Sequence, residues 1–335
     1  MEYVKLEEIC TIVSGGTPSR SKSDYWNNGN IPWIKIKDMK SKYIDSAEEF
    51  ITEEGLNNSS TKMLKSDTIL YSIFATLGEV GILKIDACTN QAIAGLSLKE
   101  DSNILKEYLY YYLKSKKKDV NNLGRGVAQN NINLSLLRKF KIPVIPLCQQ
   151  KKIIEVLDNV SSTINNYERE LALLDELVKA RFVEMFGDPV TNDMLWNTDV
   201  LKDICTKIGS GSTPRGGKES YIDEGISLIR SMNVHNAYFE YKDLAHITLD
   251  QAEKLNNVVV EHDDLLFNIT GASVARCCVV PSDVLPARVN QHVCILRCRE
   301  KINPIFLQGL LVNENYQGKL LQIAKSLSLI HISEP

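Results

Sequence analysis

The chain has 335 residues, of which 44% are hydrophobic and 24% are charged, and its formal net charge is -3. This length favours two or more domains, each with an ordinary buried core. A charge so near zero excludes a uniformly basic protein, so contact with a polyanion would depend on local clusters of Lys and Arg. The sequence contains no signal peptide and no transmembrane run, so we expect a cytoplasmic protein without a membrane partner.

The first expected domain covers residues 1–148. Its apolar strands are expected in the segments IPWIKI, TILYSIF, VGILKI and AIAGLSL, between turns rich in Gly, Asn and Asp. Residues 14–18 (SGGTP) form a turn in which the glycines permit positive φ and Pro18 fixes the exit direction. Such a turn is more often a hairpin loop than a binding loop, and it is not a Walker loop, because no Gly-Lys-Ser/Thr follows it.

Residues 149–186 are expected to form one long helix. Pro143 and Pro146 precede it, and Gly187 and Pro189 end it. Within it, apolar residues recur at steps of 4 and 3, which is the spacing of a coiled-coil seam. The seam consists of Ile153, Leu157, Val160, Ile164, Tyr167, Leu171, Leu174 and Val178. The alternative is an amphipathic helix packed on a domain core.

Residues 187–302 repeat the pattern of the first domain. LKDICT at 201–206 matches LEEICT at 6–11, and the Thr-Pro and Asn-Gln pairs of the first domain also recur in the same order. This order indicates a duplicated domain. Residues 303–326 then start a second helical region. The sequence therefore predicts an α+β fold in which two duplicated domains are separated by a long coiled-coil helix.

Several loose motifs follow one another in a specific order along nearly the whole chain. They are residues 14–18 with 31–36, residues 142–153 leading into 182–187, and residues 212–214 with 226–231. This order resembles the specificity (S) subunit of type I restriction–modification systems. The resemblance implies that 1–148 and 187–302 are target-recognition domains, each reading one half of a split site in double-stranded DNA. It also implies that the helix pairs in an antiparallel coiled coil and binds methyltransferase (modification) subunits, which motor-nuclease (restriction) subunits join.

The C-terminal end departs from this family. Members continue with a second Pro-Leu-x-x-Gln-Gln phrase and a second long helix, which residues 303–326 only begin. Residues 327–335 (LSLIHISEP) resemble a translated sequencing-library adapter, so we expect a truncated chain with a non-native tail; a genuine short C-terminus is the alternative. A truncated chain lacks the mate of its seam and is therefore expected to self-associate.

Candidate DNA contacts are polar or basic residues near the repeated turns. Lys and Arg bind phosphates, whereas Asn, Gln and Arg also bond base edges. In the first domain they are Arg20, Lys22, Lys35 and Lys37 for phosphates, Thr17, Asn90 and Gln91 for polar contacts, and Arg125 between two glycines. In the second domain they are Thr213, Arg215, Lys218, Arg230, Asn233, Asn268, Thr270, Arg276, Asn290 and Gln291. For each residue the alternative is a solvated surface group or a loop cap.

The sequence contains no catalytic or cofactor motif that we recognise. It lacks an Asn/Asp-Pro-Pro-Tyr/Phe motif, a Walker loop, a His-Glu-x-x-His motif and a Gly-x-Ser-x-Gly motif. Its 8 cysteines and 5 histidines are scattered, so we expect no metal site and no cofactor. The prediction is a non-catalytic DNA-binding subunit whose partners carry out methylation and cleavage. A protein–protein scaffold with duplicated binding domains, or a fragment of a fused restriction enzyme, remain as alternatives.

Overall fold

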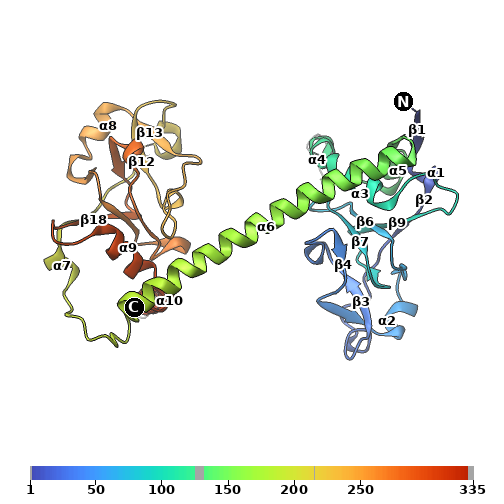
Figure 1. The fold of residues 1–335 in the computed structure, drawn as a ribbon, viewed down its shortest axis with the longest axis horizontal. Helices are drawn as coiled ribbons and strands as arrows, with labels where there is room; N and C mark the ends of the chain where they lie inside the picture. The colour runs from blue at the N-terminus through green and yellow to red at the C-terminus, as the bar shows by residue number, and fades with distance from the viewer. Residues whose placement is uncertain (1, 125–131, 215, 331–335) are drawn as a thin grey trace. The chain divides into compact units, whose positions relative to one another are not determined.

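The protein is described by a computed structural model, which covers residues 2–124, 132–214 and 216–330. The chain divides into two compact units, Met1–Glu168 and Arg169–Pro335, called unit 1 and unit 2 below. Helix α6 (Leu147–Phe186) connects the sheet-rich parts of the two units (Figure 1). The expected mixed α and β fold, with a long helix between two sheet-rich domains, is therefore confirmed.

Unit 1 contains three sheets. Its elements are β1 (Glu2–Lys5), α1 (Leu6–Ile9), β2 (Cys10–Ser14), η1 (Ser23–Tyr25), β3 (Ile31–Ile34), η2 (Ile36–Asp38), β4 (Tyr43–Ile44), β5 (Glu49–Ile51), α2 (Glu53–Asn57), β6 (Ile69–Ser72), β7 (Val80–Leu83), β8 (Cys88–Thr89), β9 (Ile93–Leu98), α3 (Lys106–Ser115), α4 (Lys117–Gly124), α5 (Leu134–Arg138) and β10 (Lys141–Val144). The strand orders are β2-β9-β6-β7-β4, β5-β3-β8 and β1-β10.

Unit 2 contains two sheets. After the end of α6 its elements are α7 (Leu201–Ile204), β11 (Cys205–Ser210), η3 (Gly217–Ser220), β12 (Ile226–Ile229), η4 (Ser231–Asn233), β13 (Ala245–Ile247), α8 (Leu249–Glu253), η5 (Asn256–Val258), β14 (Val259–Val260), β15 (Leu265–Asn268), η6 (Gly271–Ser273), β16 (Cys277–Val279), η7 (Ser282–Val284), β17 (Ala287–Val289), β18 (Val293–Cys298), α9 (Pro304–Val312) and α10 (Glu314–Ile330). The strand orders are β11-β18-β15-β16 and β13-β12-β17-β14.

The two units share one topology. The order β2-β9-β6-β7 in unit 1 corresponds to β11-β18-β15-β16 in unit 2, and β5-β3-β8 corresponds to β13-β12-β17. The registers correspond as well, because Ser14 lies opposite Ala94 in the first pair of strands and Ser210 lies opposite Cys294 in the second. The repeat in the sequence is therefore a repeat of the fold, to which unit 1 adds β4 and the β1–β10 sheet and unit 2 adds β14.

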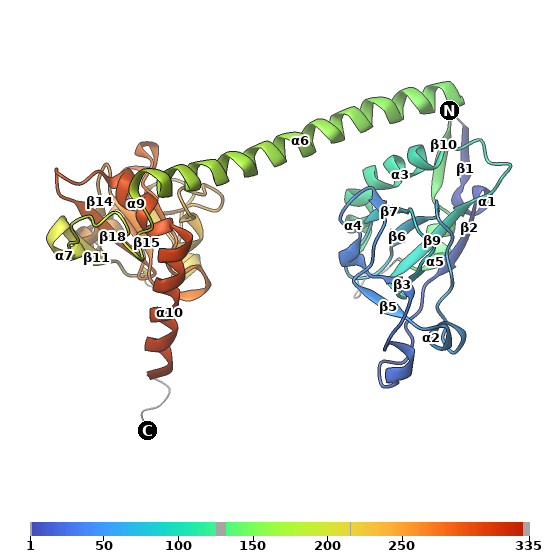
Figure 2. The same cartoon turned by 60° about the horizontal axis from the view of Figure 1, so that its bottom comes forward.

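A helix covers the corresponding strand in each unit. Helix α3 packs against β7, and helix α9 packs against β16 (Figure 2). Each helix buries two leucines spaced by one turn, Leu109 and Leu113 in α3 and Leu307 and Leu311 in α9. Strand β6, near the middle of its sheet, is buried along its whole length, as expected for a strand covered on both faces.

The first turns of α6 are tied to unit 1 by polar side chains. Gln150 is fully buried, and its Oε1 accepts a hydrogen bond from the Leu105 N–H at 2.8 Å. Its Nε2 donates to the carbonyl oxygens of Asn103 and Ile145 at 2.8 and 2.9 Å. Further along, the Asp158 carboxylate accepts hydrogen bonds from Lys42 and Tyr111. These contacts fix the direction in which the helix leaves unit 1.

The last turns of α6 are held by aromatic packing within unit 2. The ring centres of Phe182 and Phe186 lie 5.8 and 4.9 Å from that of Phe306 on α9. Gly309 on α9 makes this approach possible, since a Cβ there would lie 2.6 Å from the Phe182 ring. The helix stops before Gly187, which has a φ of 77°. Within the described residues, no helix is both long and apolar enough to span a bilayer.

Candidate nucleic-acid interface

In unit 1 the recurring turn at residues 14–18 packs against the Asn-Gln turn before β9. The Gly16 N–H donates to the Thr89 carbonyl at 2.9 Å, and the Gly15 N–H donates to the Ile93 carbonyl at 3.0 Å. A Cβ on Gly15 would lie 2.2 Å from the Asn90 carbonyl oxygen, so only glycine allows this approach. At the surface, the Thr17 hydroxyl donates to the Gln91 side-chain oxygen.

The corresponding two turns also meet in unit 2, through a different backbone hydrogen bond. The Gly211 N–H donates to the Asn290 carbonyl at 3.1 Å, and a Cβ on Gly211 would lie 1.7 Å from the Val289 carbonyl oxygen. The Thr213 hydroxyl donates to the Gln291 side-chain oxygen, as Thr17 does to Gln91. The two recurring sequence motifs are therefore partners in space, which explains why they recur together.

Four of the predicted asparagines hold turns. The side-chain oxygens of Asn90 and Asn290 accept the backbone N–H two residues further on, at 3.2 and 3.0 Å. Asn233 and Asn268 are completely buried, and their amides donate to the carbonyl oxygens of Glu240 and Ser231, both at 2.9 Å. By contrast, Gln91, Gln291 and Thr270 are exposed. The side chains that can reach a ligand are therefore the exposed ones.

Three of the five predicted cations of unit 1 form one group with two carboxylates, called the Glu48–Glu49 cluster here. Arg20 and Lys35 both contact Glu49, the former at 2.5 Å, and Lys37 contacts Glu48. Burial opposes ionisation of Glu49, but hydrogen bonds from Lys35 and Arg20 hold the pKa of its carboxyl below the ordinary value. The hydrogen bond from Lys37 likewise lowers the pKa of Glu48.

Aromatic rings support this cluster. The Arg20 guanidinium carbon lies 3.6 Å from the centre of the Trp26 ring and 5.0 Å from that of Trp33. The Trp33 indole donates to the Gly16 carbonyl of the recurring turn at 3.0 Å, and the Trp26 indole donates to the Ser19 carbonyl just after the turn at 3.1 Å. The cluster is thus attached to the turn that carries Thr17. Lys22 stands apart, and its hydrogen bond to the Tyr25 hydroxyl raises the pKa of its amine.

The cations of unit 2 are arranged differently. Arg230, at the position of Lys35, donates to the Asp243 carbonyl, and its guanidinium carbon lies 5.4 Å from the centre of the Tyr221 ring. Ala245 replaces the carboxylate, because it pairs with Leu228 as Glu49 pairs with Trp33. Arg276 lies 3.4 Å from His235. Arg125 and Arg215 lie outside the described residues, as does the side chain of Lys218, whose backbone belongs to η3.

Sequence reasoning missed one residue at this surface, His292. Its ring nitrogens contact the Gln291 amide nitrogen at 3.2 Å and the Thr270 hydroxyl. Thr213, Gln291, His292 and Thr270 thereby form a continuous line of side chains, called the polar row below. The signal in the sequence was the position of His292 directly after the repeated Asn-Gln pair, where unit 1 has Ala92.

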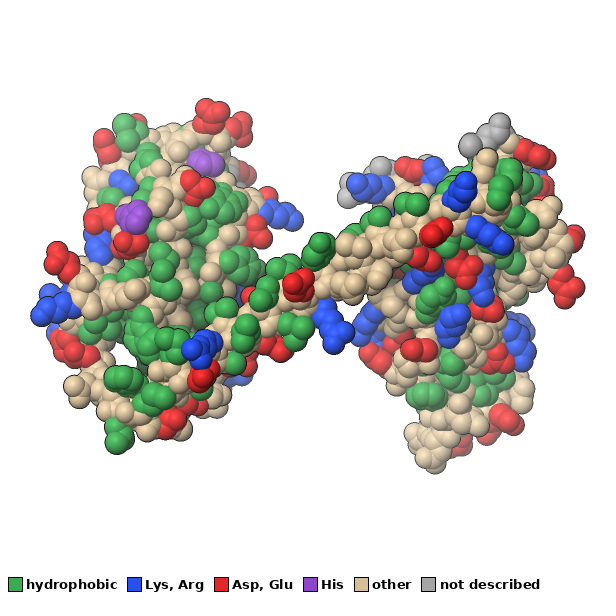
Figure 3. Space-filling view, in the orientation of Figure 1, with side chains coloured by type: hydrophobic (Ala, Val, Ile, Leu, Met, Phe, Trp, Pro, Cys, Tyr) green, Lys and Arg blue, Asp and Glu red, His purple; other side chains and the backbone are tan. Residues whose placement is uncertain are grey.

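The predicted seam of α6 faces solvent over most of its length. Val160, Ile164, Tyr167, Leu171, Leu174 and Val178 are between 50% and 70% exposed, and Ile153 is 38% exposed. Leu157 is partly buried. Apolar side chains are visible along the helix in Figure 3. The structure therefore does not support the alternative of an amphipathic helix packed on a domain core, and it leaves an apolar face for a partner.

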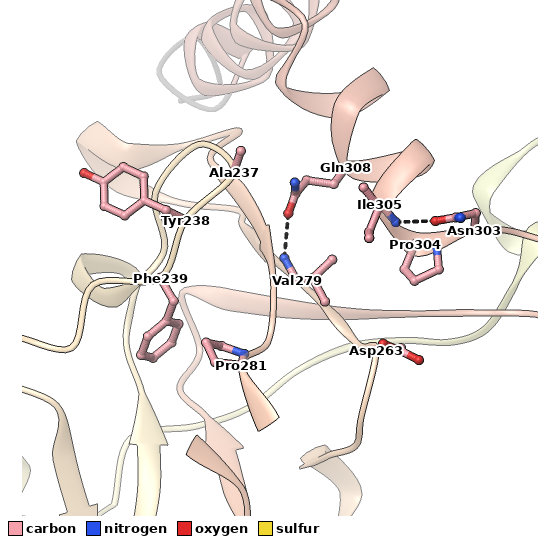
Figure 4. A pocket seen from close by; sticks show the side chains of 10 residues that line it. All are labelled: Ala237, Tyr238, Phe239, Asp263, Val279, Pro281, Asn303, Pro304, Ile305 and Gln308. Carbon is pink, nitrogen blue, oxygen red and sulfur yellow. Dashed lines mark hydrogen bonds between the residues drawn. The ribbon is translucent and has the colours of Figure 1, made fainter. Parts of the chain in front are cut away.

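Among the described residues of unit 2, pockets lie close to the start of α9. One, of about 560 Å³, lies beside the start of α9 and has Asp263 as its one charged lining residue (Figure 4). There Gln308 accepts a hydrogen bond from the Val279 N–H at 2.8 Å, and Asn303 caps α9. The other, of about 880 Å³, is lined by the aromatic rings around Phe306. In the part of the chain that the structure describes, no group of His, Cys, Asp and Glu is arranged to hold a metal ion.

Known proteins resemble this chain in sequence. A family model described as the type I restriction modification DNA specificity domain matches residues 1–175. The EcoR124I/EcoR124II specificity subunit of Escherichia coli is 34% identical over 188 residues, covering 54% of this chain and 46% of that protein. The MjaIX specificity subunit of Methanocaldococcus jannaschii is 26% identical over 272 residues, covering 78% of this chain and 60% of that protein. The chain thus matches only about half of the length of these curated relatives.

Two solved structures resemble it in fold. The S subunit of a type I restriction–modification system from M. genitalium gives a TM-score of 0.52 at 15% identity, covering 97% of this chain and 79% of that one. A chain from a structure of the assembly and conformational transition of the type I R-M system gives 0.50 at 15% identity, covering 98% and 90%. At this identity the likeness concerns the fold, including the long helix between two sheet-rich domains.

Proposed function

Because the chain belongs to the family of type I restriction modification DNA specificity domains, we propose that it binds double-stranded DNA at a bipartite site. Unit 1 reads one half-site and unit 2 reads the other. Helix α6, with 40 residues and a length of about 60 Å, sets the spacing between the half-sites. Within the complex this chain selects the sequence, while modification and restriction subunits perform methylation and cleavage.

The observation that carries this proposal is the shared frame at the recurring turns. Each unit ties a Gly-rich turn to an Asn-Gln turn and exposes a Thr–Gln pair there, Thr17 with Gln91 and Thr213 with Gln291. Around these equal frames the exposed side chains differ between the units. A common Thr–Gln pair surrounded by different exposed side chains is what two readers of different base sequences require.

The exposed seam of α6 supports the proposal that subunits assemble on this chain. Apolar side chains that recur at coiled-coil spacing and face solvent are stabilised when another helix covers them. We propose that the helices of modification subunits, or a second copy of this chain, cover the seam. Residues 331–335 of the tail lie outside the described part of the chain.

Two measurements test the proposed function. Binding of the chain to duplex DNA should weaken steeply as salt rises, because bound cations release counterions from the phosphates. A protein–protein scaffold would not retain DNA even at low salt, and that result would contradict the proposed DNA binding. Next, residues 1–148 are exchanged for those of a relative, and the methylated sites of the reconstituted complex are mapped. One half-site should change while the other is kept; a change in both, or in neither, contradicts the division of labour.

A further inference from the structure

We propose that His292 and Thr270 determine which base unit 2 accepts, by presenting a hydrogen-bond donor at the end of the polar row. This inference rests on the proposed DNA-binding function and names the residues that read one position of one half-site. Neither residue is buried, since Thr270 is exposed and His292 is partly exposed.

The hydrogen bonds of the row run in one direction. The Thr213 hydroxyl donates to the Gln291 oxygen, so the Gln291 amide nitrogen faces the His292 Nε2, at 3.2 Å. An amide nitrogen can only donate, so the His292 Nε2 accepts. The hydrogen of the imidazole is then on Nδ1, which donates to the Thr270 oxygen.

The hydroxyl hydrogen of Thr270 therefore remains available to an outside acceptor. Because each bond in a chain polarises the next, the row strengthens this terminal donor. In the major groove, guanine, adenine and thymine all offer acceptor atoms, whereas cytosine offers its amino donor. The polar row thus supplies a donor to a base that has an acceptor at the position it meets.

Unit 1 has the opposite chemistry at the same place. Ile93 pairs with Ser72 in unit 1 as Val293 pairs with Asn268 in unit 2, which aligns Ala92 with His292 and Phe74 with Thr270. Phe74 is 39% exposed, and neither it nor Ala92 has a side chain that can bond a base edge. An exposed apolar ring suits the methyl group of thymine instead. The two units thus share the strand pairing at this place, whereas the side chains that would meet a base are apolar in unit 1 and polar in unit 2.

A cation lies on the same hairpin as Thr270. Arg276 accepts the Asn268 N–H at its carbonyl oxygen, at 2.9 Å, across the β15–β16 hairpin. Its guanidinium reaches His235 at 3.4 Å. A positive charge on the hairpin that carries Thr270 is suited to a phosphate contact that positions the protein, while the polar row contacts a base.

The test uses the full chain assembled with its modification subunits, with methylated sites mapped by sequencing. Thr270→Val removes the donor at nearly constant shape, and His292→Ala removes the group that orients it. The control is Thr206→Val, at an exposed threonine of β11 outside the row. We expect either row variant to relax discrimination at one position of the second half-site by roughly 3- to 10-fold, the value of one hydrogen bond, and to leave the first half-site unchanged. The control should change neither half-site.

The outcomes separate the two proposals. If the wild-type complex selects a bipartite site and Thr270→Val leaves both half-sites unchanged, the polar row is not a reader and this inference is overturned while the proposed function stands. A change in the half-site that exchange of residues 1–148 alters would also overturn it. If the wild-type complex shows no sequence selection, the proposed function itself fails. If His292→Ala prevents folding, two variants of Thr270 still test whether the polar row reads a base. They are Thr270→Val and Thr270→Phe, and the latter introduces the residue type of unit 1.

Discussion

The Arg297 guanidinium on β18 donates two hydrogen bonds to the fully buried carboxylate of Asp264, from Nε to Oδ1 and from Nη2 to Oδ2, each at 2.8 Å. Glu261 also contacts Arg297, and the hydrogen bond to Asp264 raises the pKa of the guanidinium. The matching positions of unit 1 hold Ser97 and Thr68, whose hydroxyl oxygens are 3.2 Å apart. One site in a duplicated fold is thus filled either by a buried ion pair or by two neutral hydroxyls.

Removing one partner of this ion pair should destabilise unit 2 strongly. Asp264→Ala removes the buried carboxylate and leaves the partly exposed Arg297 guanidinium with Glu261 as its remaining carboxylate contact, which costs about 1–3 kcal/mol of unfolding free energy. The double variant Asp264→Thr with Arg297→Ser copies unit 1 and should recover much of that loss, because the one carboxylate that then loses its cation, Glu261, is exposed to solvent. Hydrogen exchange measured by mass spectrometry reports each unit separately. Equal protection of unit 2 in the wild type and Asp264→Ala would contradict the prediction.

Gln150 should anchor α6 to unit 1. Its substitution by Ala removes three hydrogen bonds and leaves the Leu105 N–H without its partner, so we expect a loss of about 2–4 kcal/mol in the unfolding free energy of unit 1. Gln149→Ala is the matched control, since Gln149 is exposed. Chemical denaturation compares the two variants. The anchoring role would be refuted if both substitutions cost the same.

The Glu48–Glu49 cluster should limit the affinity of unit 1 for phosphate. Glu49→Gln releases Arg20 and Lys35 from their shared carboxylate. Binding to non-specific duplex DNA should then strengthen, and the slope of log affinity against log salt should steepen by about one to two. Glu53→Gln, on exposed α2, makes the same change of charge outside the cluster and should have a much smaller effect. If both variants bind equally, net charge rather than the cluster controls the affinity.

Several features could be predicted from the sequence because they depend on local or periodic patterns. The 4–3 spacing between Ile153 and Val178 predicted the helix, and the repeated motifs predicted the shared topology. Periodicity says nothing of which side chains meet across the fold, however. The sequence could not show that Glu49 neutralises Arg20, that Asn233 and Asn268 are buried, or that Thr270 bonds His292, since burial and these contacts depend on how the chain folds in three dimensions.

The seam of α6 should drive association of the isolated chain. Leu171→Glu places a charge in the middle of the exposed apolar face, where a paired helix would have to bury it at a large cost. The wild type should therefore form dimers or larger species at micromolar concentration in sedimentation or light-scattering experiments, and Leu171→Glu should shift it to monomer. Asn165→Glu adds the same charge at an exposed position off the seam and should leave association intact. A wild-type monomer under these conditions would contradict the prediction.

Acid should weaken the attachment of α6 to unit 1 through Asp158. Burial opposes ionisation of this carboxyl, but hydrogen bonds from Lys42 and Tyr111 prevail and lower its pKa below the ordinary value of 3.8. A carboxyl with a lowered pKa in the folded state stabilises the fold at pH values above the unfolded pKa, and this contribution disappears as the pH falls through the folded pKa. The unfolding free energy of unit 1 should thus decrease between about pH 5 and pH 2, and less steeply in Asp158→Asn. Urea denaturation at several pH values measures how steeply the unfolding free energy falls with pH. The control Asp101→Asn, at an exposed position before α3, should keep the wild-type slope. If Asp158→Asn also keeps the wild-type slope, this carboxyl does not stabilise the junction.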